Sequence, residues 1–207
     1  MNHARWKSPT QRSEEILDFH YGPLKSSKTG IRLAVIQPGS GSKGIAIKLI
    51  DSFVTGVNKI LYHALSYTWG NGLRTKTISC NGKRLAVTPT LLEALHRFRD
   101  PDREVFLWID QLSICQDRVR ERNQQVQMMG DIFKAARKVV VWLGDDHDDS
   151  KAGMQLATQL LGITRNQKVA DLSPADLETH GLPRQGHKKW KALAAILRRP
   201  WFWRTVS

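Results

Sequence analysis

The sequence predicts an α/β fold in which a mostly parallel β-sheet carries helices on both faces, with one β-hairpin near the N-terminus and a second one inserted later. Two runs, residues 105–109 and 139–143, are continuously apolar, which is typical of strands covered on both faces. Several other segments have apolar residues at helical spacing. Strands and helices therefore alternate from residue 62 to residue 199, the pattern of an α/β layer architecture.

The N-terminal part predicts an antiparallel hairpin. Residues 31–36 and 45–50 are short runs rich in branched side chains. The segment between them contains a proline, glycines and serines, which is a turn composition. This segment lacks the GxxxxGK[ST] spacing of a phosphate-binding loop, so we do not expect nucleotide binding there.

The composition indicates one domain. A chain of 207 residues with 41% hydrophobic residues can bury a sizeable core without disulfides or metals. Residues 1–30 are polar and basic, and we expect them to be poorly ordered. Residues 31–207 are expected to form the domain, with its central motifs within residues 62–206.

A second hairpin is expected after the first central strand. Residues 62–69 predict a buried strand that runs into a glycine turn. Residues 78–87 contain Asn81 and Gly82, a pair that tolerates the positive φ angles of a two-residue hairpin turn. These residues should therefore form a small ribbon.

Helix signals begin directly after this ribbon. Thr88 and Pro89 offer a hydroxyl cap and a first-turn proline, and Thr90 and Glu93 have the spacing of a capping box. The strand at residues 139–143 is expected to be fully buried. We expect further helices at residues 119–136, 150–162 and about 190–197, with a polar loop containing Pro174 and Pro183 between the last two.

The net charge is unusual. The 32 basic residues exceed the 19 acidic residues and give a formal charge of +13. Residues 184–207 contain seven arginines and lysines and no acid. Such a basic face predicts binding of a polyanion, either nucleic acid or an anionic membrane surface, and the alternative is a solvated surface that maintains solubility. The candidate residues are Lys188, Lys189, Lys191, Arg198 and Arg199.

The two cysteines, Cys80 and Cys115, are too few for a secreted disulfide framework and predict reduced thiols buried in the fold. The chain has no secretory signal pattern and no run of apolar residues long enough to cross a membrane. We therefore expect a cytoplasmic protein.

A ligand site is expected where the parallel strands end. In open α/β sheets, ligands bind beyond the carboxyl ends of the strands. Aromatic rings there could stack on a flat ligand, glycines permit a close backbone approach, and a carboxylate could accept hydrogen bonds from ribose hydroxyls. Alternatively, the rings fill the core, the glycines make turns and the carboxylate bonds to backbone. The candidates are Tyr67, Trp69, Gly70, Asp110, Trp142 and Gly144.

Catalytic and metal chemistry has few candidates. The motifs HExxH and GxSxG are absent. Residues 145–149 are acidic apart from one histidine, but they precede a helix, where acids oppose the positive end of the dipole, so we predict no metal site. Asp110 and Glu121 are the catalytic candidates, although Glu121 could equally form a surface ion pair with Arg122.

Several stretches of the chain form a recognisable set of motifs. They are Tyr62 to Gly70, Ile78 to Leu85, Leu107 to Asp110, Gln116-Asp117, Glu121-Arg122, Gln125-Val126, Met129, Ile132-Phe133, Ala136, Val141 to Gly144, and Arg199 to Phe202 with Arg204. Taken together, these motifs make the chain resemble the fungal heterokaryon incompatibility (HET) domain. They occur in the family's order and cover roughly residues 31–206. The chain departs from the family at residues 112–116, which read Leu-Ser-Ile-Cys-Gln where the family has Leu-Cys-Ile-Asn-Gln.

The resemblance implies a function in fungal allorecognition. Such modules trigger growth arrest or programmed cell death when unlike cells fuse, which implies protein partners or self-association. HET domains are also distantly similar to Toll/interleukin receptor (TIR) domains, which implies a flavodoxin-like sheet. Some TIR domains cleave NAD with one glutamate, so NAD is a possible substrate. No cofactor is implied with certainty.

The comparison with TIR domains implies a catalytic glutamate beyond Ser207. The family pattern continues past the Pro-Trp-Phe segment into a Trp-x-x-Gln-Glu run, whose tryptophan falls at Val206 and whose Gln-Glu is missing. We therefore expect a C-terminally truncated HET domain, inactive as an enzyme in this form. Three functions remain: a death-signalling interaction module, an NAD-cleaving enzyme completed by a missing segment, and a basic polyanion-binding protein.

Overall fold

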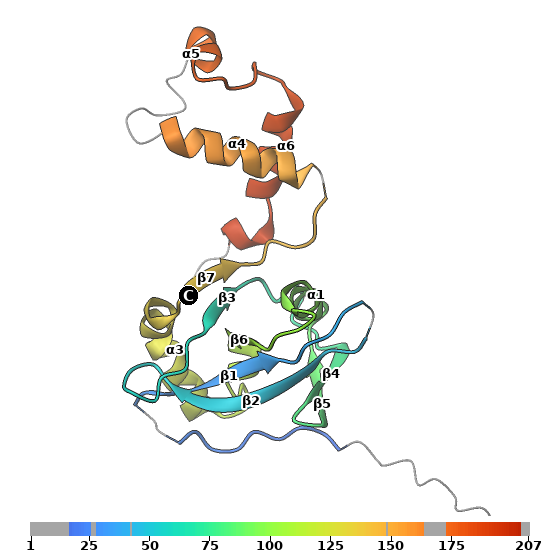
Figure 1. Ribbon diagram of the computed structural model, residues 1–207, viewed down its shortest axis with the longest axis vertical. Coiled ribbons are helices and arrows are strands. Elements are labelled where there is room, and N and C mark those ends of the chain that lie inside the picture. Colours follow the sequence, from blue (N-terminus) through green and yellow to red (C-terminus); the bar gives the residue numbers. More distant parts are fainter. Residues whose placement is uncertain (1–16, 26–27, 42, 148, 164–172, 204–207) are drawn as a thin grey trace, which may run out of the picture.

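The computed structural model describes residues 17–25, 28–41, 43–147, 149–163 and 173–203. Seven strands form one sheet in the order β5-β4-β2-β1-β6-β3-β7 (Figure 1). The strands are β1 (Gly30–Ile36), β2 (Ala46–Phe53), β3 (His63–Ser66), β4 (Lys76–Cys80), β5 (Lys83–Val87), β6 (Val105–Trp108) and β7 (Lys138–Val141). The helices are α1 (Pro89–Phe98), α2 (Asp110–Ser113), α3 (Val119–Ala135), α4 (Ser150–Ile163), α5 (Pro174–Thr179) and α6 (Lys188–Leu197), followed by a 3-10 turn at Pro200–Trp203.

Three neighbouring strands run parallel, as the sequence predicts. His63 of β3 is in register with Leu107 of β6 on one side and with Lys138 of β7 on the other. The carboxyl ends of β3, β6 and β7 therefore lie at one edge of the sheet. This arrangement is the basis of the expected ligand site.

The prediction of a mostly parallel sheet is wrong, because the sheet is mixed. The hairpin β1–β2 is antiparallel, β1 also pairs antiparallel with β6, and β4 pairs antiparallel with β5. Only β2–β4, β3–β6 and β3–β7 are parallel pairs. Both hairpins belong to this one sheet: β1 pairs with β6, and β4 of the second hairpin pairs with β2.

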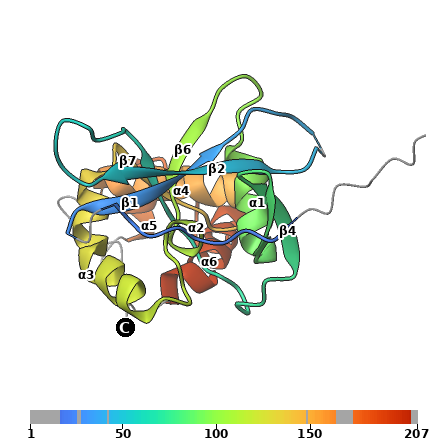
Figure 2. The ribbon, with the colours of Figure 1, turned by 90° about the horizontal axis from the view of Figure 1, so that it is seen from below.

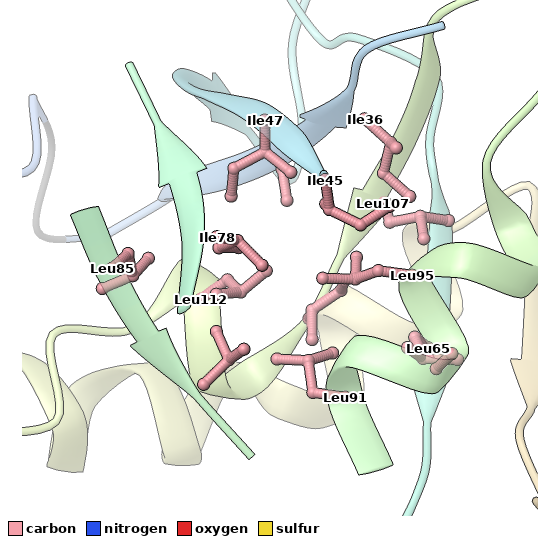
Figure 3. Packing of buried hydrophobic residues seen from close by; sticks show 14 of the residues in the cluster. Ile36, Ile45, Ile47, Leu65, Ile78, Leu85, Leu91, Leu95, Leu107 and Leu112 are labelled. Carbon is pink, nitrogen blue, oxygen red and sulfur yellow. The ribbon is translucent and has the colours of Figure 1, made fainter. Parts of the chain in front are cut away.

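The two faces of the sheet carry different helices. The side chains of β1 alternate, so that Ala34 and Ile36 pack with α1 whereas Ile31 and Leu33 pack with α3. Figures 1 and 2 show α1 and α3 on separate sides of β1. The cluster on the α1 face is drawn in Figure 3. Helices therefore cover both faces, as expected.

Local signals explain most element ends. Asn81 and Gly82 have φ angles of +51° and +77° at the β4–β5 turn. Thr88 caps α1, and its side chain accepts a hydrogen bond from Leu91 N. The helix therefore does not begin with the capping box that was expected from Thr90 and Glu93. The segment at residues 174–179, expected as loop, is helix α5, because Ser173 and Asp176 form a reciprocal capping box.

The strand β7 lies at the end of the sheet and is only partly covered. Val139 is 49% exposed and Val141 is 38% exposed. The expectation of a fully buried strand is therefore wrong. An edge strand has a neighbour on one side only, and a run of valines does not distinguish an edge strand from a central one.

Helices α4, α5 and α6 are grouped beyond β7 in Figure 1. Their core consists of Leu156, Leu177 and Leu182, with Trp190 packed against it. Gly153 allows α4 to approach the backbone of α6 closely, because a Cβ atom there would lie 2.8 Å from the carbonyl carbon of Ala192.

Candidate functional site

The carboxyl ends of β3 and β6 are joined by Trp69 and Asp110. The indole Nε1 of Trp69 donates to both carboxylate oxygens of Asp110, at 3.2 and 3.1 Å. The backbone N–H of Gln111 donates to Asp110 Oδ1 at 2.7 Å. The carboxylate therefore connects the loop after β3 to the first turn of α2, as in the backbone-bonding alternative, and a ligand role for it remains a prediction.

The other aromatic candidates are buried in the core. Tyr67 is 1% exposed and Trp142 is 8% exposed, and Trp142 packs edge-on against Phe98 with 5.9 Å between ring centroids. Gly70 and Gly144 have φ angles of +66° and +97° and make the turns after β3 and β7. These positions favour the structural alternative for both rings. Stacking on a ligand would require the rings to move.

A C-terminal segment crosses the carboxyl ends of β3 and β7. Trp201 Nε1 donates to Ser66 Oγ at 3.0 Å. Arg199 donates to Leu143 O at 3.2 Å and to Ser150 Oγ at 2.6 Å. Arg199, a candidate for polyanion binding, therefore holds α6 against the start of α4.

The remaining basic candidates lie on or next to α6. Lys188, Lys191 and Arg198 are exposed, and Lys189 is partly buried. They could contact an anionic surface without any change in the fold. Polyanion binding through these four residues stays a prediction.

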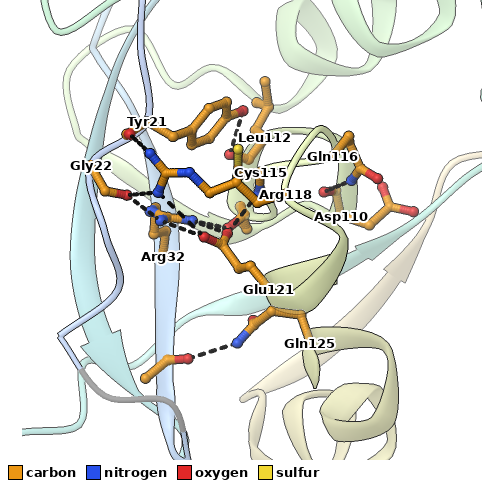
Figure 4. Close-up of polar contacts among 12 residues, drawn as sticks. Tyr21, Gly22, Arg32, Asp110, Leu112, Cys115, Gln116, Arg118, Glu121 and Gln125 are labelled. Atoms are coloured by element: carbon orange, nitrogen blue, oxygen red, sulfur yellow. Dashed lines mark hydrogen bonds and ion pairs between the residues drawn. The ribbon is translucent and has the colours of Figure 1, made fainter. Parts of the chain in front are cut away.

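Glu121, the second catalytic candidate, lies in a buried ion pair. Arg32 of β1 donates through two nitrogens to the two carboxylate oxygens, at 2.5 and 3.2 Å (Figure 4). Cys115 N donates to Glu121 Oε1 at 2.8 Å. The side chains of Arg32 and Glu121 are 5% and 10% exposed. The alternative of a surface pair with Arg122 is therefore wrong.

The ion pair sets the protonation of Glu121. Burial raises the pKa of its carboxyl, but the hydrogen bonds from Arg32 and Cys115 and the charges of Arg32 and Arg118 lower it, and the net pKa lies below the ordinary value. A carboxylate held anionic in this way is unsuited to donate a proton as a general acid. Its geometry indicates a positioning function for the loop after α2.

Arg32, the partner of Glu121, is a site residue that the sequence motifs do not indicate. Its signal in the sequence is a charged side chain inside the apolar run 31–36. A buried charge needs a partner, and a guanidinium also needs further acceptors. Arg32 finds them in Glu121, Ser113 O and Gly22 O.

Residues 17–25 lie against the sheet. Figures 1 and 2 show this segment running from the α3 side of the molecule to the β4–β5 hairpin. Phe19 N donates to Arg84 O at 2.8 Å, and Tyr21 OH donates to Leu112 O at 3.1 Å. Residues 1–16, where most of the segment expected to be poorly ordered lies, are outside the described residues.

A pocket of about 520 Å³ opens between this segment, the β4–β5 hairpin and the loop after α2. Arg74, Arg84 and Arg118 line it together with His20, Asp18 and Asp117. The thiol-bearing residue Cys115 also lines it. No single stretch of sequence indicates this site, because its walls come from three separate segments.

Burial disfavours the charged forms of two groups, the Cys80 thiol and the Tyr21 hydroxyl. Burial raises the pKa of the Cys80 thiol to about 12, although a hydrogen bond involving the Leu49 backbone lowers it. Burial also raises the pKa of the Tyr21 hydroxyl. Both cysteines are buried and form no disulfide, which confirms the expectation that they lie inside the fold.

Two features are absent from the part of the chain that the structure describes. Three or more histidine, cysteine or acidic side chains are nowhere grouped closely enough to hold a metal ion. None of the described helices has the length and apolar character needed to cross a membrane.

Comparison with known proteins identifies the family. Residues 62–205 match the family described as heterokaryon incompatibility protein (HET). The chain is 39% identical over 113 residues to heterokaryon incompatibility protein 6, OR allele, of Neurospora crassa, an alignment that covers 48% of this chain and 16% of that protein. No solved structure matches the chain. Because the match spans most of the chain, including β3 to β7, the chain belongs to the heterokaryon incompatibility (HET) family.

Proposed function

We propose that the chain is a fungal allorecognition module that signals growth arrest or cell death by docking a protein partner or a second copy of itself. The main observation in support is the exposed apolar surface of β7. Its strand edge has no neighbour in the described sheet, and Val139 and Val141 are exposed beside it. Such an edge can pair with a strand from another chain.

The internal contacts of the catalytic candidates support docking over catalysis. Asp110 is bonded to Trp69 and to the backbone of α2. Both oxygens of Glu121 accept hydrogen bonds from Arg32. Both carboxylates are thus engaged in contacts within the fold, whereas signalling by docking requires no reacting group.

The test replaces one exposed valine with arginine. In a fungal host, expression of the wild-type chain should arrest growth, and Val139→Arg should abolish the arrest because a charge on β7 opposes strand pairing and burial. Val126→Arg is the matched control, since Val126 is 51% exposed and belongs to α3 instead of β7. Equal arrest by both variants would argue against docking through β7.

Light scattering separates the two kinds of docking. Self-association would be supported if the mass of the wild-type chain rises with concentration while the mass of the Val139→Arg variant stays at that of one chain. A wild-type chain that stays monomeric while losing activity with Val139→Arg would support a different protein partner.

NAD cleavage is a second candidate, supported by the order of the parallel strands. Along the chain, β3, β6 and β7 are the first, second and third of these strands, and in the sheet they stand in the order second, first, third. This is the order of the first three strands in flavodoxin-like sheets, to which TIR-like folds are related by the resemblance described above. Incubation with NAD followed by product chromatography tests this function. Absence of turnover, both by this chain and by a version extended through the expected Gln-Glu, would exclude it.

Polyanion binding is a third candidate, supported by the exposed lysines of α6. Replacing Lys188 and Lys191 with glutamine should weaken binding to an RNA or DNA oligonucleotide. The slope of log affinity against log salt should also fall, by up to about two if both lysines contact phosphates. Lys83→Gln, an exposed lysine on β5, is the charge-matched control. Salt-independent affinity, or equal effects at both places, would reject this surface.

A further inference from the structure

The pocket between residues 17–25 and the β4–β5 hairpin has the size of a small-molecule site and an excess of basic side chains, three arginines against Asp18 and Asp117. Its volume of about 520 Å³ lies in the usual range for small-molecule sites. Arginines enter it from three parts of the chain: Arg74 precedes β4, Arg84 belongs to β5, and Arg118 precedes α3. We propose that this pocket binds a small phosphate-bearing anion.

The arginines keep donors available inside the pocket. Arg74 is exposed and makes no hydrogen bond or ion pair with any described residue. Arg118 uses its two terminal nitrogens on Gly22 O and Tyr21 O, at 3.0 and 2.6 Å. These bonds hold the guanidinium against the N-terminal segment and leave Nε unused.

Asp18 fixes the third arginine. Its Oδ1 lies 3.2 Å from both Nε and Nη2 of Arg84. This contact orients the guanidinium of Arg84 at the rim of the pocket and leaves its Nη1 available to donate to a ligand. It also places a negative charge next to the space that an anion would enter, so Asp18 competes with the ligand for Arg84.

The geometry favours phosphate over carboxylate. A carboxylate is planar, and the fork of a single guanidinium satisfies both of its oxygens. A terminal phosphate presents three oxygens in different directions and can accept hydrogen bonds from guanidinium groups on several sides. Arginines on three walls match this requirement. Phe19, Leu85 and Ala86 line the same pocket and provide apolar surface for an organic part of the ligand.

This site is separate from the surfaces discussed above. Its lining includes none of the residues at the carboxyl ends of β3 and β7 and none of the basic residues of α6. The inference therefore does not depend on the proposed docking through β7. A phosphate ligand would bridge residues 17–25 and the β4–β5 hairpin and so stabilise their contact.

The test is calorimetric titration of the whole chain with inorganic pyrophosphate at constant ionic strength. The wild type should show saturable binding at one site. Arg74→Gln should weaken it by about tenfold, as expected for the loss of one charge-assisted hydrogen bond. Because Arg74 is exposed and makes no hydrogen bond or ion pair with a described residue, this change should leave the melting temperature unaltered.

Lys83→Gln is the matched control. Lys83 is exposed, adjoins Arg84 in β5 and does not line the pocket. Its replacement by glutamine therefore removes one positive charge close to the pocket without removing a donor from its lining. Its affinity should stay within about twofold of the wild type if hydrogen bonding in the pocket matters more than net charge.

Asp18→Asn should change affinity in the opposite direction. Removing the competing carboxylate should tighten pyrophosphate binding severalfold. Absence of saturable binding by the wild type would overturn the proposal, as would equal losses in Arg74→Gln and Lys83→Gln. Binding lost only on replacing Lys188 and Lys191 would also overturn it and would assign the anion to α6. Citrate binding as tightly as pyrophosphate would refute the preference for phosphate.

Discussion

Glu121→Ala is expected to lower the free energy of unfolding by about 3–5 kcal/mol, the usual cost of leaving one member of a buried ion pair without its partner. Arg32 is 4% exposed and would keep its charge inside the fold with only Ser113 O and Gly22 O as acceptors. Cys115 N would lose its acceptor as well. Urea unfolding followed by circular dichroism measures the change.

Two further variants distinguish the cost of an unpaired buried charge from a general effect of removing a carboxylate on the free energy of unfolding. Glu104→Ala removes an exposed carboxylate that lies 3.3 Å from Lys48 and should leave stability nearly unchanged. Arg32→Met combined with Glu121→Leu should recover much of the loss, because two apolar side chains can replace a buried pair. If the double variant is less stable than Glu121→Ala, the explanation by an unpaired charge fails.

The pair also predicts a pH dependence. The folded pKa of Glu121 lies below its ordinary value of 4.5, so the carboxylate contributes stability above that pH and loses the contribution as pH falls through the folded pKa. The free energy of unfolding should therefore decline on acidification below about pH 4.5. The decline should be shallower in the Arg32→Met/Glu121→Leu variant, where the titrating carboxyl is gone. Equal slopes would contradict this assignment.

Gly153→Ala is expected to destabilise the packing of α4 on α6 by about 1–3 kcal/mol, the usual cost of overpacking. The new Cβ would lie 2.7 Å from Ile196 Cδ1 and 2.8 Å from both Ala192 C and Leu193 N. A side chain can rotate away, but the two backbone atoms move only with the whole of α6. Amide hydrogen exchange should therefore accelerate in α4 and α6 and stay unchanged in β1.

Gly162→Ala is the control on the same helix. A Cβ at Gly162 would meet nothing within 4 Å, so alanine should stabilise α4 by up to about 1 kcal/mol through helix propensity. The two substitutions are chemically identical and are predicted to have opposite signs. Equal effects of the two on hydrogen exchange would show that close packing at Gly153 does not hold the helices together.

Local patterns predicted the central part of the fold well. The apolar runs ending at Trp108 and Val141 are strands, and the run from residue 62 supplies the strand between them. Side-chain periodicity and turn residues depend on neighbours a few positions apart, so they are readable from the chain itself. The edge of the sheet at which these strands end could be predicted for the same reason.

The candidate site was predicted less completely. Trp69 and Asp110 are brought together, although they are 41 positions apart. The sequence predicts the correct strand end for Trp142, but an apolar ring there can face either a ligand or the core. Only the packing of Phe98 from α1 decides that it faces the core.

The sequence by itself determined the family, the identity of most elements and the parallel direction of the strands β3, β6 and β7. Only the tertiary structure decided that Arg32 meets Glu121, that β7 is an edge and that three arginines surround one pocket. The physical reason is the range of the interactions. Helix and strand preferences arise between near neighbours, whereas ion pairs and pocket walls join segments up to about a hundred residues apart, and their partners depend on the path of the whole chain.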